Sequence, residues 1–334
     1  MLLSLLALFL GTRSTLALTT LNGSGATFPA PLYLRWASEF GKSHPDILVN
    51  YQGIGSGAGI VNFTKGLTDF CASDVLLTST EIEKNHGNLL MIPLSAGMIV
   101  LAYNLPNIKE LKLSREAYSG IFLGTIVQWD DPRIMASNPG VPLPSLPITV
   151  ITRSDGSGTT SLLTEHLATM SAEFENQVGS GRSVKWPVGI AGKGNDGVTS
   201  LIKGTSGAIG YVEYGFAKNN HLAMAELENK AGSMITASPQ AGSEALLHSD
   251  FLHQENGFNP DPRGIHDYPI TGFTWMILRK SYPAEKSKAL KEFFSYALTQ
   301  GQSLSTSLGY LPLPDPVEKK SLQSLEQIQS SSDK

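Results

Sequence analysis

Three turns in the sequence combine glycine, serine and threonine in a way that suits the binding of a small anion. They span residues 25–28, 53–57 and 155–159, and each precedes a predicted helix. The N-terminus of a helix carries unpaired backbone N–H groups and partial positive charge, so it attracts anions. Four hydroxyl side chains in these turns add hydrogen-bond donors: Thr27, Ser56, Ser157 and Thr159. Each turn alone is also typical of an ordinary helix cap, but the three together predict an anion site.

An arginine lies directly beside the third turn. Arg153 follows a predicted strand over residues 148–152. A guanidinium group in that place can grip tetrahedral oxygens through two parallel hydrogen bonds. The alternative is a surface arginine paired with Asp155, and both interpretations can hold because a carboxylate can orient an arginine that binds a ligand.

An acidic residue, Asp74, follows the short apolar strand predicted over residues 70–72. Near neutral pH phosphate still carries a hydrogen, which a carboxylate can accept. A fully ionised oxyanion such as sulfate has no such hydrogen and would be repelled, which is the strong form of specificity. Asp74 is therefore a candidate for selecting a protonated anion, with a simple turn aspartate as the alternative.

The elements that must position these residues alternate short strands with amphipathic helices, which predicts an α/β fold. Two apolar stretches, 89–94 and 98–103, are separated by Ser95-Ala96-Gly97, and this break is interpreted as a crossing between lobes. Residues 269–279 are predicted to form the return crossing. The resulting organisation has a discontinuous first lobe over residues 19–95 and 270–316 and a second lobe over 96–269. We expect the ligand in the cleft between them.

The two ends of the chain have their own signatures. Residues 1–17 are predicted to be an export signal, because Met1–Leu10 is nearly all apolar and small residues follow it. That apolar run is shorter than the roughly 20 residues that span a membrane. We therefore expect a soluble mature protein in the periplasm. Residues 317–334, rich in Ser, Lys, Gln and Glu, are predicted to form a flexible C-terminal tail.

Composition excludes several classes of protein. With 41% hydrophobic and 16% charged residues among 334, the chain is predicted to be globular rather than disordered. A formal net charge of −4 argues against a sequence-independent nucleic-acid binder. The single cysteine, Cys71, rules out a disulfide framework and is predicted to be a small buried hydrophobic residue.

Three alternative functions compete with an anion receptor. A dinucleotide-binding enzyme is suggested by the G-x-G-x-x-G match at residues 192–197, although this explains neither Arg153 nor the other turns. A hydrolase would need Ser157 or Ser56 as nucleophile, but neither lies in G-x-S-x-G, and the seven histidines form no H-x-x-x-H pair. A receptor for another oxyanion, such as sulfate, is the nearest alternative, and Asp74 argues against it.

Taken together, the motifs resemble the phosphate-binding proteins of the Pst transporter. Their order between about residues 22 and 312 is that of the family, and Ser154 and residues 75–77 vary from its commonest forms without removing a ligand group. The matching segments are 23–31, 50–56, 72–74, 155–159, 185–187, 192–197 and 207–214.

The resemblance implies a two-lobed periplasmic binding protein of type II that closes on phosphate. By matching motif, its phosphate contacts would be Thr27, Phe28, Ser56, Asp74, Arg153, Ser157, Gly158 and Thr159. Asp74 would accept the proton of phosphate, and Asp155 would orient Arg153. The resemblance further implies no cofactor and no catalysis. The partners would be the membrane permease and ATPase subunits of a phosphate ABC transporter, and we expect a monomer that binds no nucleic acid.

Overall fold

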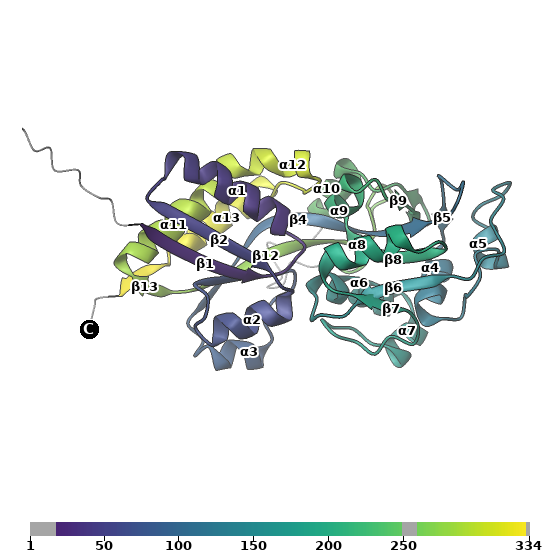
Figure 1. Ribbon diagram of the computed structural model, residues 1–334, viewed down its shortest axis with the longest axis horizontal. Helices are drawn as coiled ribbons and strands as arrows, with labels where there is room; N and C mark the ends of the chain where they lie inside the picture. The colour runs from purple at the N-terminus through teal and green to yellow at the C-terminus, as the bar shows by residue number, and fades with distance from the viewer. Residues whose placement is uncertain (1–17, 249–258, 332–334) are drawn as a thin grey trace, which may run out of the picture.

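The computed structural model describes residues 18–248 and 259–331, which form two lobes lying side by side (Figure 1). The main sheet has the strand order β2-β1-β3-β12-β4-β8-β6-β7, with β9 also paired to β4. Helices pack against both parts of this sheet, as the alternating sequence pattern predicts. None of the helices in the described ranges is long and apolar enough to cross a membrane. The export signal predicted over residues 1–17 lies outside the described residues.

The first lobe is built from one part of the sheet and the helices around it. Strand β1 pairs in parallel with β2 and β3, and β12 pairs antiparallel with β3. Its elements are β1 (Thr19–Gly25), α1 (Ala30–Ser43), β2 (Ile47–Gly53), α2 (Ser56–Thr64), β3 (Phe70–Ser73), α3 (Ser79–Lys84), β12 (Thr271–Arg279), β13 (Ser281–Pro283), α11 (Ala284–Leu298), α12 (Ser305–Leu308), α13 (Asp315–Leu325) and β14 (Gln329–Ser331).

The second lobe holds the other part of the sheet, where β6 pairs in parallel with both β7 and β8. Its elements are β5 (Lys112–Leu113), α4 (Arg115–Leu123), α5 (Pro132–Met135), β6 (Thr149–Arg153), α6 (Gly158–Met170), α7 (Ala172–Gln177), β7 (Ile190–Gly192), α8 (Gly194–Gly204), β8 (Ala208–Glu213), α9 (Tyr214–Asn219), β9 (Ala223–Met224), β10 (Glu226–Glu228), β11 (Met234–Ile235) and α10 (Pro239–Leu247).

Helix α1 illustrates how the sequence fixes these elements. Proline stands in its first turn, where the missing N–H is tolerated. Its apolar residues recur at helical spacing and are buried, and they are Leu32, Tyr33, Trp36 and Phe40. The indole Nε1 of Trp36 donates to the carbonyl of Gly301 at 2.8 Å, which satisfies the one polar atom of this buried ring.

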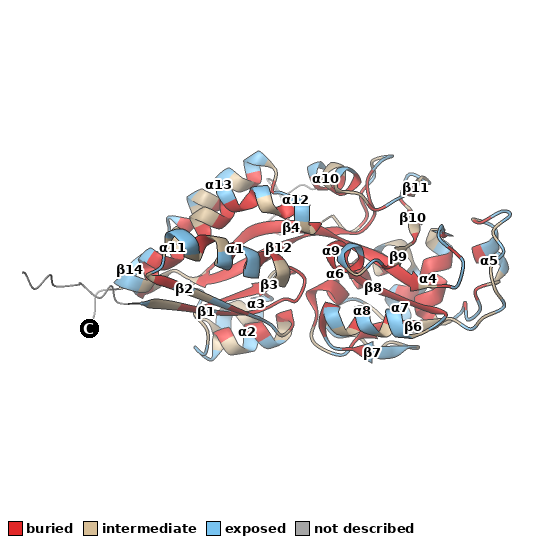
Figure 2. Cartoon of the chain, turned by 45° about the horizontal axis from the view of Figure 1, so that its top comes forward, coloured by how far each residue is buried: buried red, intermediate tan, exposed pale blue. Residues whose placement is uncertain are grey.

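Strand β4 (Leu89–Asn104) crosses from one lobe to the other without interruption. Its residues 89–98 pair with β12 and residues 99–104 pair with β8. Both β4 and β12 are buried along most of their length (Figure 2). The break predicted at residues 95–97 is therefore not a gap between strands. The register against β12 shifts between Thr274 and Trp275 instead, which leaves Leu94, just before the small residues, as a bulge within one strand.

The carboxyl ends of the parallel strands all face the junction of the lobes. In the first lobe these are the ends of β1, β2 and β3, and in the second those of β6 and β7. Ligands in α/β proteins bind beyond these strand ends. The three glycine-containing turns follow β1, β2 and β6, so the topology brings them to one place.

The C-terminal segment differs from the prediction of a flexible tail over residues 317–334. Residues 315–325 form α13, and β14 pairs in parallel with β13. Although the segment is polar in composition, Val317, Ser321 and Leu325 recur every four residues and are buried. The hydroxyl of Ser321 also donates to the carbonyl of Pro93 on β4 at 3.1 Å. The average composition of the segment is polar although one face of the helix is buried, so composition alone wrongly predicted a flexible tail.

Val317→Ala should therefore lower the free energy of unfolding by about 1.5 kcal/mol, because it removes two buried methyl groups. Urea denaturation followed by circular dichroism measures the change. Lys319→Ala, on the exposed side of the same helix, is the control and should change stability by less than about 0.5 kcal/mol. Equal stability of the two variants would contradict the packed position of α13.

Candidate anion site between the lobes

The three predicted turns meet where the lobes contact each other. The backbone N–H of Gly158, the first residue of α6, donates to the hydroxyl of Ser56 at the start of α2 at 3.2 Å. Beside it, the N–H of Gly57 donates to the carbonyl of Gly156 at 2.9 Å. These bonds join N-terminal ends of helices from opposite lobes, so the structure has the lobes closed on one another.

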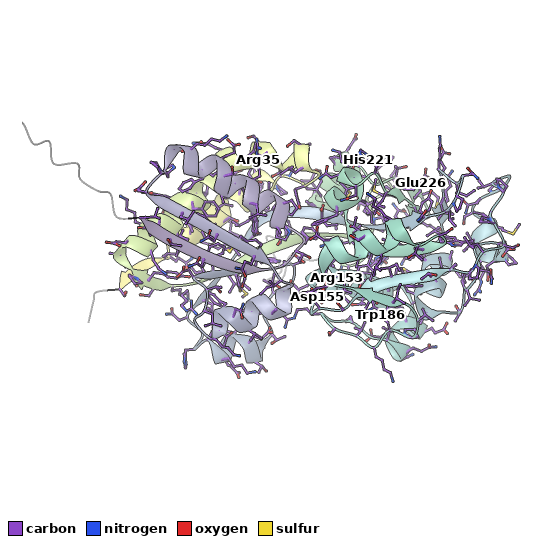
Figure 3. The ribbon with its side chains drawn as sticks, viewed as in Figure 1. Arg35, Arg153, Asp155, Trp186, His221 and Glu226 are labelled. Atoms are coloured by element: carbon purple, nitrogen blue, oxygen red, sulfur yellow. The ribbon has the colours of Figure 1, made fainter. Side chains whose placement is uncertain are left out.

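Arg153 lies at the centre of this junction (Figure 3), and its side chain is only 1% exposed. Its Nε donates to Oδ1 of Asp155 at 2.8 Å and its Nη2 to Oδ2 at 2.5 Å. The same guanidinium donates from Nη2 to the hydroxyl of Thr27 in the first lobe at 3.2 Å. The surface-arginine alternative is therefore wrong, while the predicted pairing with Asp155 is present.

The carboxylate of Asp155 is held by donors on two sides. Besides Arg153, the backbone N–H of Gly194 donates to its Oδ1 at 2.9 Å. Burial acts to raise the pKa of Asp155, but the hydrogen bonds and charge of Arg153 outweigh it and hold the pKa below its usual range. Asp155 is thus ionised near neutral pH and fixes the plane of the guanidinium.

The hydroxyl of Thr27 accepts from more donors than a hydroxyl oxygen has lone pairs. In addition to Arg153, the N–H and the side-chain amide Nδ2 of Asn195 donate to it at 3.2 and 3.0 Å. A hydroxyl oxygen has two acceptor lone pairs and one hydrogen. Because the lone pairs are engaged, the hydrogen of Thr27 is left to donate, which is what an anion ligand requires.

Asn195 is a site residue that the sequence interpretation missed. It lies in the first turn of α8, directly after the glycine turn of residues 192–194. The G-x-G-x-x-G match that suggested a dinucleotide site begins this helix and presents the N–H of Gly194 to Asp155. The available signal was a fourth helix start after a parallel strand, with a polar side chain in its first turn.

Asn195→Ala should weaken phosphate binding by about 1–2 kcal/mol, roughly tenfold, because Thr27 loses a donor that orients it. The change also removes the side-chain oxygen that accepts from the N–H of Glu213 at 3.0 Å. Calorimetric titration with phosphate measures the effect. Asn138→Ala removes another buried asparagine of the second lobe, far from the turns, and should leave the affinity unchanged. Equal affinities in the two variants would show that Asn195 has no positioning role.

The start of α6 has a side-chain N-cap and also lies very close to the first lobe. The hydroxyl of Ser157 accepts from the N–H of Thr160 at 3.1 Å, so the N-cap interpretation of Ser157 is correct, and its hydrogen can still donate. The hydroxyl of Thr159 accepts from Nη1 of Arg153 at 3.4 Å. A Cβ atom at Gly158 would meet the side chain of Asp74 at 2.6 Å, so only glycine lets α6 approach the first lobe this closely.

Asp74 is 2% exposed and lies at the end of β3, facing α6. Burial raises the pKa of Asp74 to about 7, against the lowering effects of a hydrogen bond from Thr274 and the charge of Arg153. The hydroxyl of Thr274 donates to its Oδ1 at 3.0 Å. Thr274 was also missed from sequence, although a threonine between Phe273 and Trp275 in an apolar strand was the visible signal.

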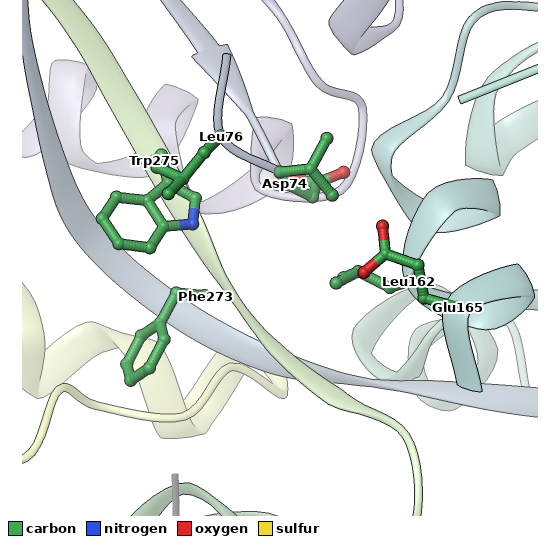
Figure 4. A pocket seen from close by; sticks show the side chains of 7 residues that line it. Asp74, Leu76, Leu162, Glu165, Phe273 and Trp275 are labelled. Atoms are coloured by element: carbon green, nitrogen blue, oxygen red, sulfur yellow. The ribbon is translucent and has the colours of Figure 1, made fainter. Parts of the chain in front are cut away.

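A pocket of about 190 Å³ borders Asp74 where the lobes face each other. Figure 4 shows Asp74 and Trp275 of the first lobe across this pocket from Leu162 and Glu165 on α6. The pocket therefore lies next to the junction and has walls from both lobes.

Phe28 differs from the other predicted contact residues because its side chain is an apolar ring packed in the core. Its ring is buried, and its carbonyl accepts from the hydroxyl of Tyr310 at 2.8 Å. A Cβ at Gly97 would meet this ring at 2.7 Å, so the phenyl group packs against the crossing strand β4. Any contact of Phe28 with an anion would therefore have to come from its backbone.

The site has the chemistry of an anion receptor. Of the eight predicted contact residues, Arg153 alone carries a positive charge, and hydroxyls and helix starts surround it. Within residues 18–248 and 259–331, no three His, Cys, Asp or Glu side chains gather closely enough to hold a metal ion. The lone Cys71 is buried, as predicted.

Comparison with known proteins identifies the family. Residues 11–300 match the model of the PBP superfamily domain. The phosphate-binding protein PstS of Haemophilus influenzae is 41% identical over 316 residues, covering 93% of each chain. PstS of Methanocaldococcus jannaschii is 36% identical, covering 91% of this chain and 85% of its own.

Solved structures with a similar fold include phosphate-binding proteins. A high-affinity periplasmic phosphate-binding protein solved with bound phosphate superposes with a TM-score of 0.74 at 23% identity, covering 90% of this chain and 92% of the other. At that identity the likeness concerns the fold, and it agrees with a two-lobed α/β binding protein. The sequence and fold together place this chain in the PstS family of phosphate-binding proteins, within the PBP superfamily.

Proposed function

We propose that this chain is an extracytoplasmic receptor that binds inorganic phosphate between its lobes and delivers it to an ABC transporter for import. One observation carries the proposal: helix starts from both lobes converge on the buried guanidinium of Arg153, and the buried carboxyl of Asp74 lies beside them. A dehydrated anion needs such donors, and the carboxyl suits an anion that carries a proton.

The proposed contacts come from both lobes. Arg153 supplies the positive charge, Asp74 accepts the proton of phosphate, and the remaining residues supply hydroxyl and backbone N–H donors. Asp155 and Asn195 orient the donors without touching the ligand. The donors are Thr27, the backbone of Phe28, Ser56, Ser157, Gly158 and Thr159.

Binding is coupled to closure in this proposal. Phosphate bridges helix starts of the two lobes, so it binds the closed form more tightly than the open one and shifts the population toward it. Strands β4 and β12 carry the chain between the lobes. We place the lobe boundaries near residues 95–96 and 269–270, where these strands cross.

The remaining parts of the proposal concern the setting of the receptor. The closed receptor docks on membrane permease subunits, and ATPase subunits of the transporter supply the energy. The receptor acts in the periplasm as a monomer and needs no cofactor. It releases phosphate chemically unchanged, so it is not an enzyme.

Calorimetry on ligand-stripped protein tests the proposal. The purified mature protein is partially unfolded, dialysed and refolded, then titrated with phosphate and with sulfate at about pH 8, above the pKa of about 7 of Asp74. Tight one-to-one binding of phosphate and no response to sulfate are expected. Absence of phosphate binding would overturn the proposed ligand. Turnover of a phosphate ester would overturn the receptor function in favour of a hydrolase.

A further inference from the structure

An ion pair outside the anion site joins the two lobes. Glu81 lies on α3 of the first lobe, and Arg182 lies between α7 and β7 of the second lobe. The Nη2 of Arg182 donates to Oε1 of Glu81, and each side chain is 20% exposed. Because the partners belong to different lobes, this contact requires the lobes to be close together.

The carboxylate of Glu81 is held in place before it meets Arg182. Its Oε2 accepts from the N–H and the hydroxyl of Thr78 at 2.9 and 3.1 Å, which forms a capping box at the start of α3. The other oxygen is thereby directed to the second lobe. A carboxylate that is already ordered loses less side-chain freedom when it forms an ion pair.

Arg182 also contacts the third anion-binding turn. Its backbone carbonyl accepts from the N–H of Ser157 at 2.8 Å, and Ser157 caps α6. One residue therefore connects the first lobe, through Glu81, to the turn that presents Gly158 and Thr159. A contact made only in the closed state and linked to the binding turn can slow the opening of the lobes.

We propose that the Glu81–Arg182 pair is an inter-lobe clasp that stabilises the closed receptor and slows the release of phosphate. The inference rests on the proposed function, since it needs phosphate as the ligand. Both are positioning residues, and neither is one of the proposed phosphate contacts. The clasp supplies part of the preference for the closed form, which is what converts closure into affinity.

The test compares phosphate affinity and dissociation rate in wild type, Glu81→Gln, Arg182→Gln and the double variant. Glutamine preserves the capping box and removes the charge. Each single variant should raise Kd about three- to fivefold, chiefly through faster dissociation. The double variant should be no weaker than either single one. In 1 M salt, where the Debye length is about 3 Å, the difference from wild type should shrink.

Two control variants separate loss of the clasp from loss of a helix cap and from loss of an ion pair within one lobe. Thr78→Ala removes the capping hydroxyl but keeps the backbone N–H that holds Oε2 of Glu81, so the carboxylate stays ordered for the clasp. Arg133→Gln removes an ion pair with Asp131 within the second lobe. Both should leave the dissociation rate unchanged. An equal effect of Thr78→Ala and Glu81→Gln, additive effects in the double variant, or unchanged dissociation in both single variants would overturn the clasp alone. Failure of wild type to bind phosphate would overturn the proposed function and the clasp with it.

Discussion

Arg153→Ala is expected to weaken phosphate binding by about 3–5 kcal/mol, a few hundredfold or more. The guanidinium is the one positive charge among the proposed contacts, and its side chain is only 1% exposed. Removing it leaves the dehydrated anion without a cationic partner and beside the ionised carboxylate of Asp155. Both effects act in the same direction, so the loss should exceed that of any single hydroxyl donor.

Arg153→Lys separates charge from geometry. Lysine keeps the positive charge but lacks the planar fork of the guanidinium, which donates two hydrogen bonds to Asp155 and one each to Thr27 and Thr159. It should recover part of the affinity that alanine loses and remain weaker than wild type. Arg133→Ala, which removes a partly exposed arginine of the second lobe, is the control and should bind phosphate normally.

Calorimetry gives the affinities, and thermal unfolding without ligand checks that each variant is folded. The second measurement is needed because Arg153→Ala strands the buried carboxylate of Asp155. A folded Arg153→Ala protein whose affinity lies within tenfold of wild type would contradict the role given to Arg153.

The sequence was sufficient for local features with a strong physical cause. Glycine-containing turns between strands and helices predicted where helices begin, and the structure starts α2 and α6 at Ser56 and Gly158. The pairing of Arg153 with Asp155 was accessible because the two residues are two positions apart and can meet across one turn.

Contacts between segments far apart in the chain could not be predicted from the sequence in the same way. Asn195 donates to Thr27 across 168 positions, and Thr274 donates to Asp74 across 200. Neither residue belongs to a glycine turn with a hydroxyl, so the pattern that found the other residues could not include them. The place of Thr274 beside Asp74 follows from the strand order, in which β12 lies next to β3. A single sequence without that topology gives no reason to join these pairs.

Asp74→Asn is expected to allow sulfate to bind measurably near neutral pH. In the proposed wild-type site the carboxylate accepts the proton of phosphate and repels an anion that has none. Asparagine is uncharged and its amide nitrogen can donate to an oxyanion, so the penalty against sulfate should fall by more than tenfold. Competition between sulfate and phosphate, followed by calorimetry, measures the change. Unchanged rejection of sulfate would count against the selective role of Asp74.

Wild-type selectivity should depend on pH for the same reason. Because burial raises the pKa of Asp74 to about 7, the carboxyl is protonated below that pH and can then donate to sulfate. Rejection of sulfate should therefore be strongest above pH 7 and weaken as the pH falls toward 6, while Asp74→Asn shows no such dependence.

The sign of the stability effect gives an independent check on the same group. A carboxyl whose folded pKa lies above its ordinary 3.8 binds its proton more tightly in the folded state than in the unfolded state. Its contribution to the free energy of unfolding is therefore complete below pH 3.8 and is lost as the pH rises through about 7. The ligand-free wild type should thus lose stability relative to Asp74→Asn between those limits. A constant difference across this range, measured by urea denaturation, would mean that Asp74 is already ionised in the folded protein. Selection against sulfate would then rest on a permanent negative charge, and the predicted weakening of selectivity at low pH would disappear with it.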